Sequence, residues 1–518
     1  MASFQTLIVL IFLATILVGV AQKLRTPYPI ALVLAGTVVG FIPGLKVISF
    51  DPNLILIIVL PPILYYAAFS ISFREFKRNW KEIFSLALGL VILTTLVIGV
   101  IFKWCFPQWP WALAFAFGAI VSPPDSIAAT AIMSRFAIKP RILAIVEGES
   151  LVNDASALVL YKMAVAAILS GSFSLSTASV EFVKVVSGGI IVGLALGLLL
   201  QMLSRKYLSP VVAVLFSFSI PYITYIVADE LGVSGVLAVV INGLIGARII
   251  AKHHSSLRRI LGYTFWDIFS TLLNCFVFML IGLQLKGLAS SMEPRQVLLY
   301  ALYGLLLTLI LIVIRLAWIY AKSGFAYMKA LARPEKNTLC PEILRGAAIV
   351  GWSGMRGIVS LTAALALPFM PGRDAVIFIT FVIILLTLLL PSTTLAYLIR
   401  LMKIEHHEEH QRVHQARKRL AHVAEEKIRH LHERGSITDK EHAFLNRYFN
   451  LQRFIFEISN SNLKKLSTLE TARLKVFKAM RDELLRMWEM QEIDDRLFRQ
   501  LEHELDVEES HFTRAELK

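Results

Sequence analysis

Residues 146–160 read VEGESLVNDASALVL, which places Glu147, Glu149 and Asp154 in a stretch otherwise apolar enough to lie in a bilayer. A charged side chain at the centre of a membrane costs roughly 2.5–3.5 kcal/mol on insertion scales. Ionisable residues at that depth therefore usually face an ion or proton path. We expect this stretch to be the helix around which the fold is built.

The polar residues of this stretch fall on two helical faces. At about 100° per residue, Glu147, Ser150 and Asp154 share one face, whereas Glu149 and Asn153 share a second. Two polar faces on one helix predict two different roles for its polar side chains. One face can meet solvent and a transported ion, while the other is held by the rest of the protein.

The composition is that of a membrane protein. Of 518 residues, 56% are hydrophobic and 17% are charged, against about 25% charged residues in soluble domains. The excess of positive charge lies entirely in the first 400 residues, because the remainder carries 22 basic and 22 acidic side chains. Basic residues in short membrane loops set orientation, so we do not expect nucleic acid as a partner.

Thirteen apolar stretches approach the roughly 20 residues of a transmembrane helix: 5–21, 29–45, 53–72, 83–102, 111–134, 142–169, 181–203, 209–228, 233–251, 262–285, 296–321, 344–367 and 375–399. Loops after odd-numbered stretches hold 19 basic residues and the others hold five. The positive-inside rule then predicts an external N-terminus and a cytoplasmic C-terminal tail. We expect an all-α polytopic membrane protein, with a transmembrane domain over 1–403 and a helical, regulatory tail over 404–518.

Two of these stretches are interrupted at their centres. Ser122-Pro123-Pro124-Asp125-Ser126 cannot continue a helix, because proline lacks the amide N–H, and residues 351–357 (GWSGMRG) are rich in helix-weakening glycine. Interrupted helices in matching positions of two halves indicate the midplane site of a transporter. Their offset of seven stretches predicts repeats of inverted orientation.

The tail has apolar residues at helical spacing, which predicts a small helical bundle. Arg434-Gly435-Ser436 predicts a helix stop followed by a cap. His406, His410 and His414 share one helical face, so a proton sensor or metal site is conceivable. The alternative is a solvated juxtamembrane helix, because acidic residues are interleaved with these histidines.

Asp125 and Asp154 are the carboxylates that we expect to bind an ion. Together with Ser150 and the backbone carbonyls freed by the break, they offer the oxygen ligands that a hard monovalent cation prefers. A carboxyl whose charged form is disfavoured by burial holds either a proton or a cation, and this competition is sufficient for exchange. Two structural alternatives remain: an ion pair of Asp154 with Lys162, and a helix-capping role for Asp125.

The other charges of the apolar half have structural interpretations. Glu149 and Arg356 are predicted to form a salt bridge, since a lone buried charge is costly. We expect entrance or interfacial charges toward helix ends at Asp229, Glu230 and Asp267. Arg248 and Arg315 are expected to snorkel or to pair with these acids. The sequence contains no G-x-x-x-x-G-K-[ST] phosphate loop, which argues against an ATP-driven pump. Neither an enzymatic activity nor a cofactor is expected.

At these residues the sequence resembles the bacterial sodium/proton antiporters of the monovalent cation:proton antiporter-1 family (the NhaP and NHE type). The likeness covers about residues 1–400. It is carried by Leu60-Pro61-Pro62, Phe117-Gly118-Ala119-Ile120, Glu147-Gly148-Glu149-Ser150, Asn153-Asp154, Ser234-Gly235 and Arg356-Gly357. Together these motifs are specific, whereas each alone is weak.

The resemblance implies thirteen helices in dimerisation and core parts, and a homodimer in the bacterial inner membrane that works by elevator-like alternating access. The Asn-Asp pair implies electroneutral exchange of one cation for one proton. By motif match, Na⁺ is bound at Asp125, Ser150 and Asp154, beside Asn153 and the carbonyl of Pro124, and the bracing salt bridge is Glu149 with Arg356.

Two departures from the family bear on the choice among Na⁺, K⁺ and Li⁺. The usual Thr-Asp-Pro at the unwound helix is Pro124-Asp125-Ser126 here, which keeps a carbonyl but removes a threonine hydroxyl. Many relatives have an acid where this chain has Tyr66. The leading hypothesis is antiport of a monovalent cation, Na⁺ above others, against protons. The alternatives are a K⁺-preferring antiporter, a gated cation channel and a membrane-anchored sensor.

Overall fold

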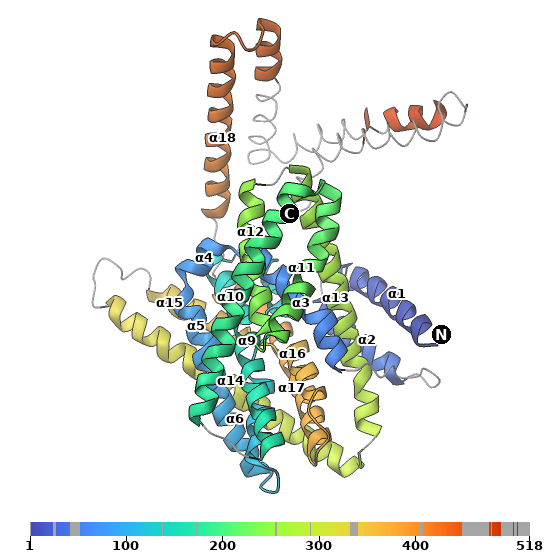
Figure 1. Cartoon of the computed structure of the whole chain (residues 1–518), viewed down its shortest axis with the longest axis vertical. Coiled ribbons are helices and arrows are strands. Elements are labelled where there is room, and N and C mark those ends of the chain that lie inside the picture. Colours follow the sequence, from blue (N-terminus) through green and yellow to red (C-terminus); the bar gives the residue numbers. More distant parts are fainter. Residues whose placement is uncertain are drawn as a thin grey trace. The chain divides into compact units, whose positions relative to one another are not determined.

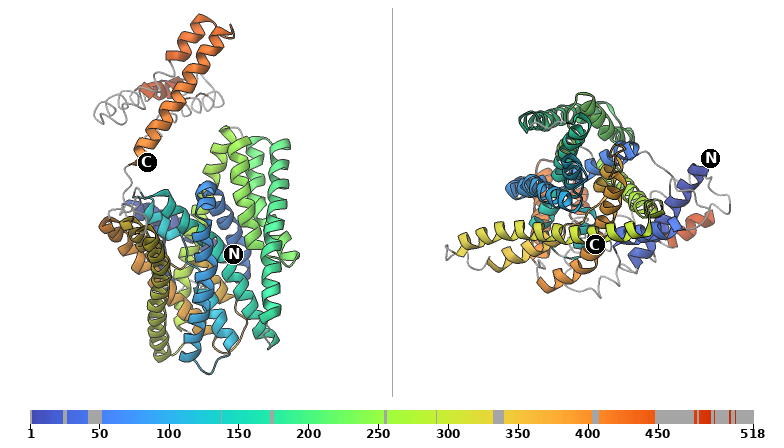
Figure 2. Two further views of the ribbon diagram at one scale, coloured as in Figure 1. Left: turned by 90° about the vertical axis from the view of Figure 1, so that its left-hand side faces the viewer. Right: turned by 90° about the horizontal axis from the view of Figure 1, so that it is seen from below.

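The computed structural model divides the chain into two compact units, residues 1–406 and 407–518. The structure describes residues 2–23, 27–41, 52–136, 138–171, 175–253, 256–290, 292–331, 340–402 and 408–447, and beyond them 476, 477, 479–487, 490, 501 and 505. Both units are built from helices (Figure 1). Most helices of the first unit run in one common direction, and α14 (Pro294–Leu331) lies obliquely to them (Figure 2).

The helices of the first unit follow one another through short connections. They are α1 (Ala2–Lys23), α2 (Tyr28–Phe41), α3 (Pro52–Ser70), α4 (Phe73–Arg78), α5 (Trp80–Phe84), a π-helical segment over Ser85–Leu90, α6 (Val91–Cys105), α7 (Trp111–Val121), α8 (Ile127–Met133), α9 (Pro140–Ser170), α10 (Leu175–Tyr207), α11 (Pro210–Glu230), α12 (Gly235–His253), α13 (Ser256–Ser290), α14, α15 (Cys340–Trp352), α16 (Ile358–Leu365) and α17 (Arg373–Met402). Pro140 and Pro210 occupy the first turns of α9 and α11, where the missing amide N–H is not needed.

Seven helices in the described ranges are long and apolar enough to cross a membrane: Trp80–Cys105, Pro140–Ser170, Ser179–Ser204, Pro210–Glu230, Leu257–Leu285, Pro294–Gly324 and Arg373–Met402. Shorter apolar helices are Val9–Ala21, Tyr28–Phe41, Ile57–Ser70, Trp111–Val121, Gly235–Ile250 and Ile343–Trp352. These segments coincide in order with the thirteen apolar stretches of the sequence. The prediction of an all-α polytopic fold is confirmed.

Both predicted interruptions are present. Residues 122–126 separate α7 from α8, and residues 353–357 separate α15 from α16. The two breaks lie side by side, because the N–H of Asp125 donates to the carbonyl of Met355 at 2.6 Å in an isolated antiparallel bridge. An antiparallel crossing is the arrangement expected of repeats that have opposite membrane orientations.

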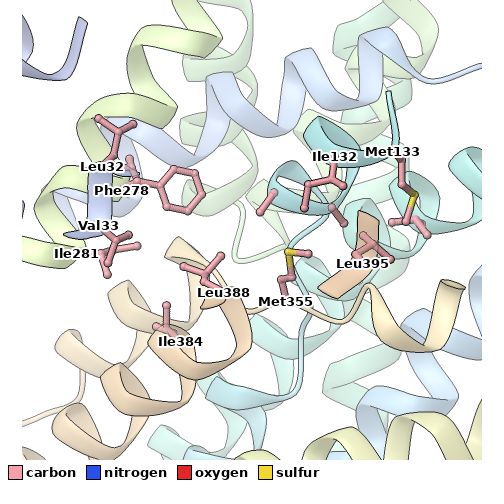
Figure 3. Close-up of a cluster of buried hydrophobic side chains, with 14 of the residues drawn as sticks. Leu32, Val33, Ile132, Met133, Phe278, Ile281, Met355, Ile384, Leu388 and Leu395 are labelled. Atoms are coloured by element: carbon pink, nitrogen blue, oxygen red, sulfur yellow. The ribbon is translucent and has the colours of Figure 1, made fainter. Parts of the chain in front are cut away.

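The side chain of Met355 fixes the second break in the hydrophobic core. It is fully buried against Ile132 and Met133 of α8 and Leu388 and Leu395 of α17 (Figure 3). The same cluster continues into α2 and α13, which supply Leu32, Val33, Phe278 and Ile281. The break is therefore a fixed part of the core although it is not helical.

Glycines allow α2 and α13 to approach each other closely. A Cβ on Gly36 would overlap the carbonyl of Met279, and a Cβ on Gly282 would overlap the backbone of Val33 and Thr37. Small residues at helix interfaces permit such close packing in membranes. The two helices therefore form one tightly packed pair.

The buried ion pair differs from the predicted one. Glu149 of α9 pairs with Arg315 of α14, whose Nη1 lies 2.5 Å from Oε1 and whose Nη2 lies 2.8 Å from Oε2. The side chains of Glu149 and Arg315 are only 1% and 4% exposed. The prediction of a Glu149–Arg356 salt bridge is therefore wrong. The basic partner is Arg315, and the ion pair connects α9 with α14.

The physical reason is that Arg356 is occupied by the backbone of the two breaks. Its Nε donates to the carbonyl of Val121 at 2.9 Å, and its Nη1 donates to the carbonyl of Gly354 at 2.5 Å. Carbonyls at a helix end lack donors within the helix, and in the hydrocarbon core no water replaces those donors. Arg315 reaches from a neighbouring helix, so its guanidinium can bind both Glu149 and the end of α15.

The second unit is described mainly through α18 (Glu408–Glu433) and the turn after it. Gly435 has φ +65°, the left-handed conformation that commonly ends a helix. Thr438 and Glu441 then form a capping box: Glu441 Oε2 accepts from Thr438 N–H at 2.8 Å, and Thr438 Oγ1 accepts from Glu441 N–H at 3.4 Å. The predicted helix stop is confirmed, and the cap lies at Thr438, two residues after the predicted Ser436. Of the predicted histidine face, His406 lies outside the described residues.

We expect Glu149→Gln to destabilise the protein by about 3–5 kcal/mol, because Arg315 would be left as a buried charge without its carboxylate. Thermal unfolding of the purified protein in detergent measures the effect. The matched control is Asp229→Asn, which breaks an exposed pair with Lys162 and should cost at most about 1 kcal/mol. Equal melting temperatures for the two variants would contradict the structural role assigned to the buried pair.

Candidate ion-binding site

Asp125 lies in the first break, and its two carboxylate oxygens have different surroundings. Oδ1 accepts a hydrogen bond from the N–H of Ile127 at 2.8 Å, so this oxygen caps the first turn of α8. Oδ2 is enclosed and has no hydrogen-bond partner in the part of the chain that the structure describes. The capping alternative is therefore correct for one oxygen, and the other oxygen remains available to a ligand.

The second break leaves room for this carboxylate at Gly357. A Cβ at this position would overlap the side chain of Asp125, including Oδ2. The backbone of Asp125 is held at the same time by Met355 of the same break. The position of the carboxylate thus depends on both breaks.

α9 is fastened to the first break by two side chains. Asn153 Nδ2 donates to the carbonyl of Pro124 at 3.2 Å, and Ser150 Oγ accepts from the N–H of Ser126 at 3.2 Å. The other polar atom of the Asn153 amide, Oδ1, is enclosed and meets no hydrogen-bond donor among the described residues. Four of the residues predicted to form the site are thereby brought to one place on α9 and the break.

Asp154 lies on the same side of α9 and is 8% exposed. Within the described ranges its carboxylate has no hydrogen bond and no ion pair. The alternative of an ion pair with Lys162 is excluded, because Lys162 Nζ lies 3.2 Å from Asp229 Oδ1 instead. A buried carboxylate is costly unless it is neutralised, so this site calls for a counter-charge, which none of the described side chains supplies by an ion pair.

Asp125 and Asp154 line one cavity of about 360 Å³, bounded by α2, α3, α8, α9, α13 and α16. Ser150 and Glu147 line it from α9. Its rim includes the exposed Ser70 at the end of α3 and the exposed Ser134 after α8. The cavity therefore opens toward the end that carries the basic connections after these helices.

Sequence reasoning missed the pairing of Arg315. A signal was present, because Arg315 is a lone charge inside the apolar stretch 296–321, and a charge at that depth is normally paired or faces a cavity. It was assigned instead to a helix end. Arg248, grouped with it, lies over the ring of Phe73, with its guanidinium carbon 5.2 Å from the ring centroid.

Relatives of the chain include several proteins named as exchangers. The antiporter of sodium, potassium, lithium and rubidium against protons from Bacillus pumilus is 33% identical over 392 residues, with 72% of this chain and 57% of the relative covered. The low-affinity Na⁺/H⁺ antiporter NhaS1 of Synechocystis is 31% identical, with 76% and 74% covered. The uncharacterized exchanger YjcE of Escherichia coli is 28% identical, with 98% and 99% covered. The chain thus spans little more than half of the first relative.

A solved structure with a similar fold is that of the sodium proton antiporter MjNhaP1 from Methanocaldococcus jannaschii at pH 8. The match has a TM-score of 0.61 and 22% sequence identity, and it covers 77% of this chain and 98% of that one. At this identity the likeness establishes the fold alone. A family model described as sodium/hydrogen exchanger, transmembrane, matches residues 8–401. The chain belongs to this family of sodium/hydrogen exchangers, as its motifs indicated, and is a multi-pass membrane protein.

Proposed function

We propose that this protein exchanges a monovalent cation, Na⁺ by preference, for H⁺, and that the two ions compete for the carboxyl of Asp154. The observation that carries the proposal is a buried carboxylate that has no partner among the described residues, in one cavity with Asp125, whose Oδ2 likewise has none there. Each ion neutralises the carboxylate, and neither can bind while the other is bound. No covalent step or nucleotide is needed for such exchange.

The competition of both ions for one carboxyl supports a stoichiometry of one cation for one proton. Among the described residues the carboxylate of Asp154 has no ion pair. Its charge is therefore not balanced by a neighbouring basic side chain. A single proton or a single monovalent cation balances it, so the loaded site has the same net charge in both forms and the exchange is electroneutral.

The cation would be held by oxygen atoms, as a hard ion requires. Asp125, Asp154 and Ser150 all line the cavity, and their side chains carry the oxygen atoms. The carbonyl of Pro124 already accepts from Asn153 Nδ2, but a carbonyl oxygen has a second lone pair and can also contribute. In this proposal Asn153 holds the carbonyl of Pro124 in position through its hydrogen bond.

Alternating access completes the proposal. The protein would work as a homodimer in the cytoplasmic membrane of a bacterium, with its tail in the cytoplasm and its cavity open to that side. The basic connections at the open end support this orientation. The relative from Bacillus pumilus is named for potassium, lithium and rubidium as well as sodium, which favours a K⁺-preferring antiporter as the second candidate.

Exchange is tested with purified protein in proteoliposomes that contain a pH-sensitive dye. We expect Na⁺ added to acid-loaded vesicles to drive proton efflux, and we expect Asp154→Asn to reduce this efflux to the level of empty vesicles. The amide keeps the size of the side chain but cannot take up a proton. Parallel additions of K⁺ and Li⁺ measure the cation preference.

The same vesicles separate exchange from conduction. An imposed membrane potential should leave the exchange rate unchanged, whereas a gated channel would carry current and collapse the potential. Asp229→Asn is the control, because Asp229 pairs with Lys162 and does not border the cavity. Normal exchange by the Asp154→Asn protein would overturn the proposed function.

Gly357→Ala tests whether the second break shapes the site. The added methyl group would displace the carboxylate of Asp125, so we expect the KM for Na⁺ to rise about tenfold or more, the loss of roughly one ligand interaction. Gly346→Ala is the matched control, since its Cβ would lie 3.6 Å from Ile142 Cδ1 in ordinary contact. Equal KM values for the two variants would contradict this role of Gly357.

A further inference from the structure

Asp267 is a charged residue that the mechanism above does not use. It lies in the apolar helix segment Leu257–Leu285, ten residues from its start, or about 15 Å along the helix at 1.5 Å per residue. Asp267 therefore lies nearly three turns inside the helix and not in its first turn. Asp267 is nevertheless exposed, and among the described side chains no basic group lies within ion-pair distance of it.

A hydrogen bond connects Asp267 to the cavity wall. The hydroxyl of Tyr66 donates to Asp267 Oδ1 at 3.3 Å, and Tyr66 lines the cavity that contains Asp125. The ring of Tyr66 is itself held in a stack on Trp266, with centroids 6.3 Å apart and planes 9° apart. Tyr28, also in the cavity wall, is within electrostatic range of both Asp125 and Asp267.

The helix face that carries Asp267 leads into the cavity. Ser270 and Asn274 follow at spacings of three and seven residues, so the three side chains share one face of α13. Ser270 and Asn274 both line the cavity, and Asn274 Nδ2 donates to Ser270 Oγ at 3.4 Å. A polar track therefore runs along α13, and Asp267 is its outer end.

An unpaired carboxylate at this depth is costly against lipid but not against water. Its link to Tyr66 and its place on the cavity face of α13 indicate that it meets the water of the cavity mouth. A negative charge between low-dielectric walls concentrates cations and speeds their arrival. Asp229, which is also acidic and exposed, is neutralised by Lys162 and has no bond to a cavity-lining residue comparable to that of Asp267 with Tyr66.

We propose that Asp267, oriented by the hydroxyl of Tyr66, is a cation-capture site at the mouth of the cavity. It takes up a hydrated monovalent cation from solution and passes it along the polar face of α13 toward Asp125 and Asp154. This inference rests on the proposed function, because it assigns the entry step of the same transport path. It also gives Tyr66 a role as a positioning residue.

Asp267→Asn in everted membrane vesicles tests the proposal, because the cytoplasmic face then meets the added cation. Removing the charge should raise the KM for Na⁺ by roughly 3–10-fold while the maximal rate stays within about twofold, since only capture is weakened. Asp267→Glu keeps the charge and should restore the KM. Tyr66→Phe removes only the hydroxyl and should give an intermediate KM, and Asp229→Asn should leave the KM unchanged.

Ionic strength provides a second readout, and its first part uses only the unaltered protein. An impermeant salt screens exposed charges over about 10 Å at 0.1 M and more strongly above that concentration. It should therefore raise the KM of the unaltered protein toward that of Asp267→Asn, whose own KM should hardly change. A purely structural role of Asp267 predicts neither result.

The outcomes separate this inference from the proposed function. If the unaltered protein exchanges ions and Asp154→Asn abolishes exchange, an unchanged KM in Asp267→Asn overturns the capture site alone. A lower maximal rate with an unchanged KM overturns it too, because it indicates a structural role. If the Asp267→Asn protein does not insert into the membrane, two other measurements decide whether the capture site exists. These are the KM of Tyr66→Phe and the salt dependence of the KM of the unaltered protein. A lack of exchange by the unaltered protein overturns the proposed function itself.

Discussion

Backbone carbonyls that lose their helical donors at membrane depth are the constraint on which this structure depends. No water is available in the hydrocarbon core to donate hydrogen bonds to such carbonyls, yet two helices are interrupted there. The protein supplies donors from side chains: Arg356 for Val121 and Gly354, Arg315 for the end of α15, and Asn153 for Pro124. Only with these donors in place can two non-helical segments cross in the core.

This arrangement also determines the charge of the site. Guanidinium groups are well suited to the task, because each carries five donors and stays charged. Two positive charges are thus placed beside the breaks for a structural reason. One of them, Arg315, is matched by Glu149, whereas Arg356 is held by the carbonyls of Val121 and Gly354. The positive charges near the site therefore follow from how the backbone carbonyls are satisfied.

The sequence predicted the parts of the molecule that depend on local composition. Apolar length predicted the thirteen stretches, and Pro123-Pro124 and the glycines of residues 351–357 predicted the breaks, because these residues act on their own backbone. Helical spacing predicted that Ser150 and Asp154 share a face. It also placed Asn153 on another face, and that face proved to contact the first break.

Pairings between distant helices were not predictable in the same way. Glu149 could be assigned an arginine from burial alone, but choosing Arg315 over Arg356 required knowing which carbonyls each guanidinium meets. The bond between Tyr66 and Asp267 joins residues 201 positions apart, and nothing in either local sequence indicates the other. Tyr66 stands where many relatives have an acid, which suggested that a negative charge is missing there. In the structure the carboxylate of Asp267, from α13, lies beside Tyr66.

The contacts around the cavity also indicate which helices would move together during transport. α9 is tied to α14 by Glu149 and to the first break by Asn153 and Ser150, and the first break is tied to the second by Asp125. These elements carry the site as one body. The facing wall belongs to α2, α3 and α13, and glycine contacts lock α2 against α13.

Between these two bodies lies the cavity, and beside it Leu60 and Leu64 of α3 pack in one apolar cluster with α9 and α16. A displacement of the site-bearing helices along the α2–α13 wall would close the present opening without breaking the ion pair or the bridge between the breaks. Such a motion keeps every freed carbonyl partnered throughout. Movement of a single broken helix would instead expose carbonyls and a buried arginine at once, so the energetics of the breaks favour alternating access by movement of a rigid body.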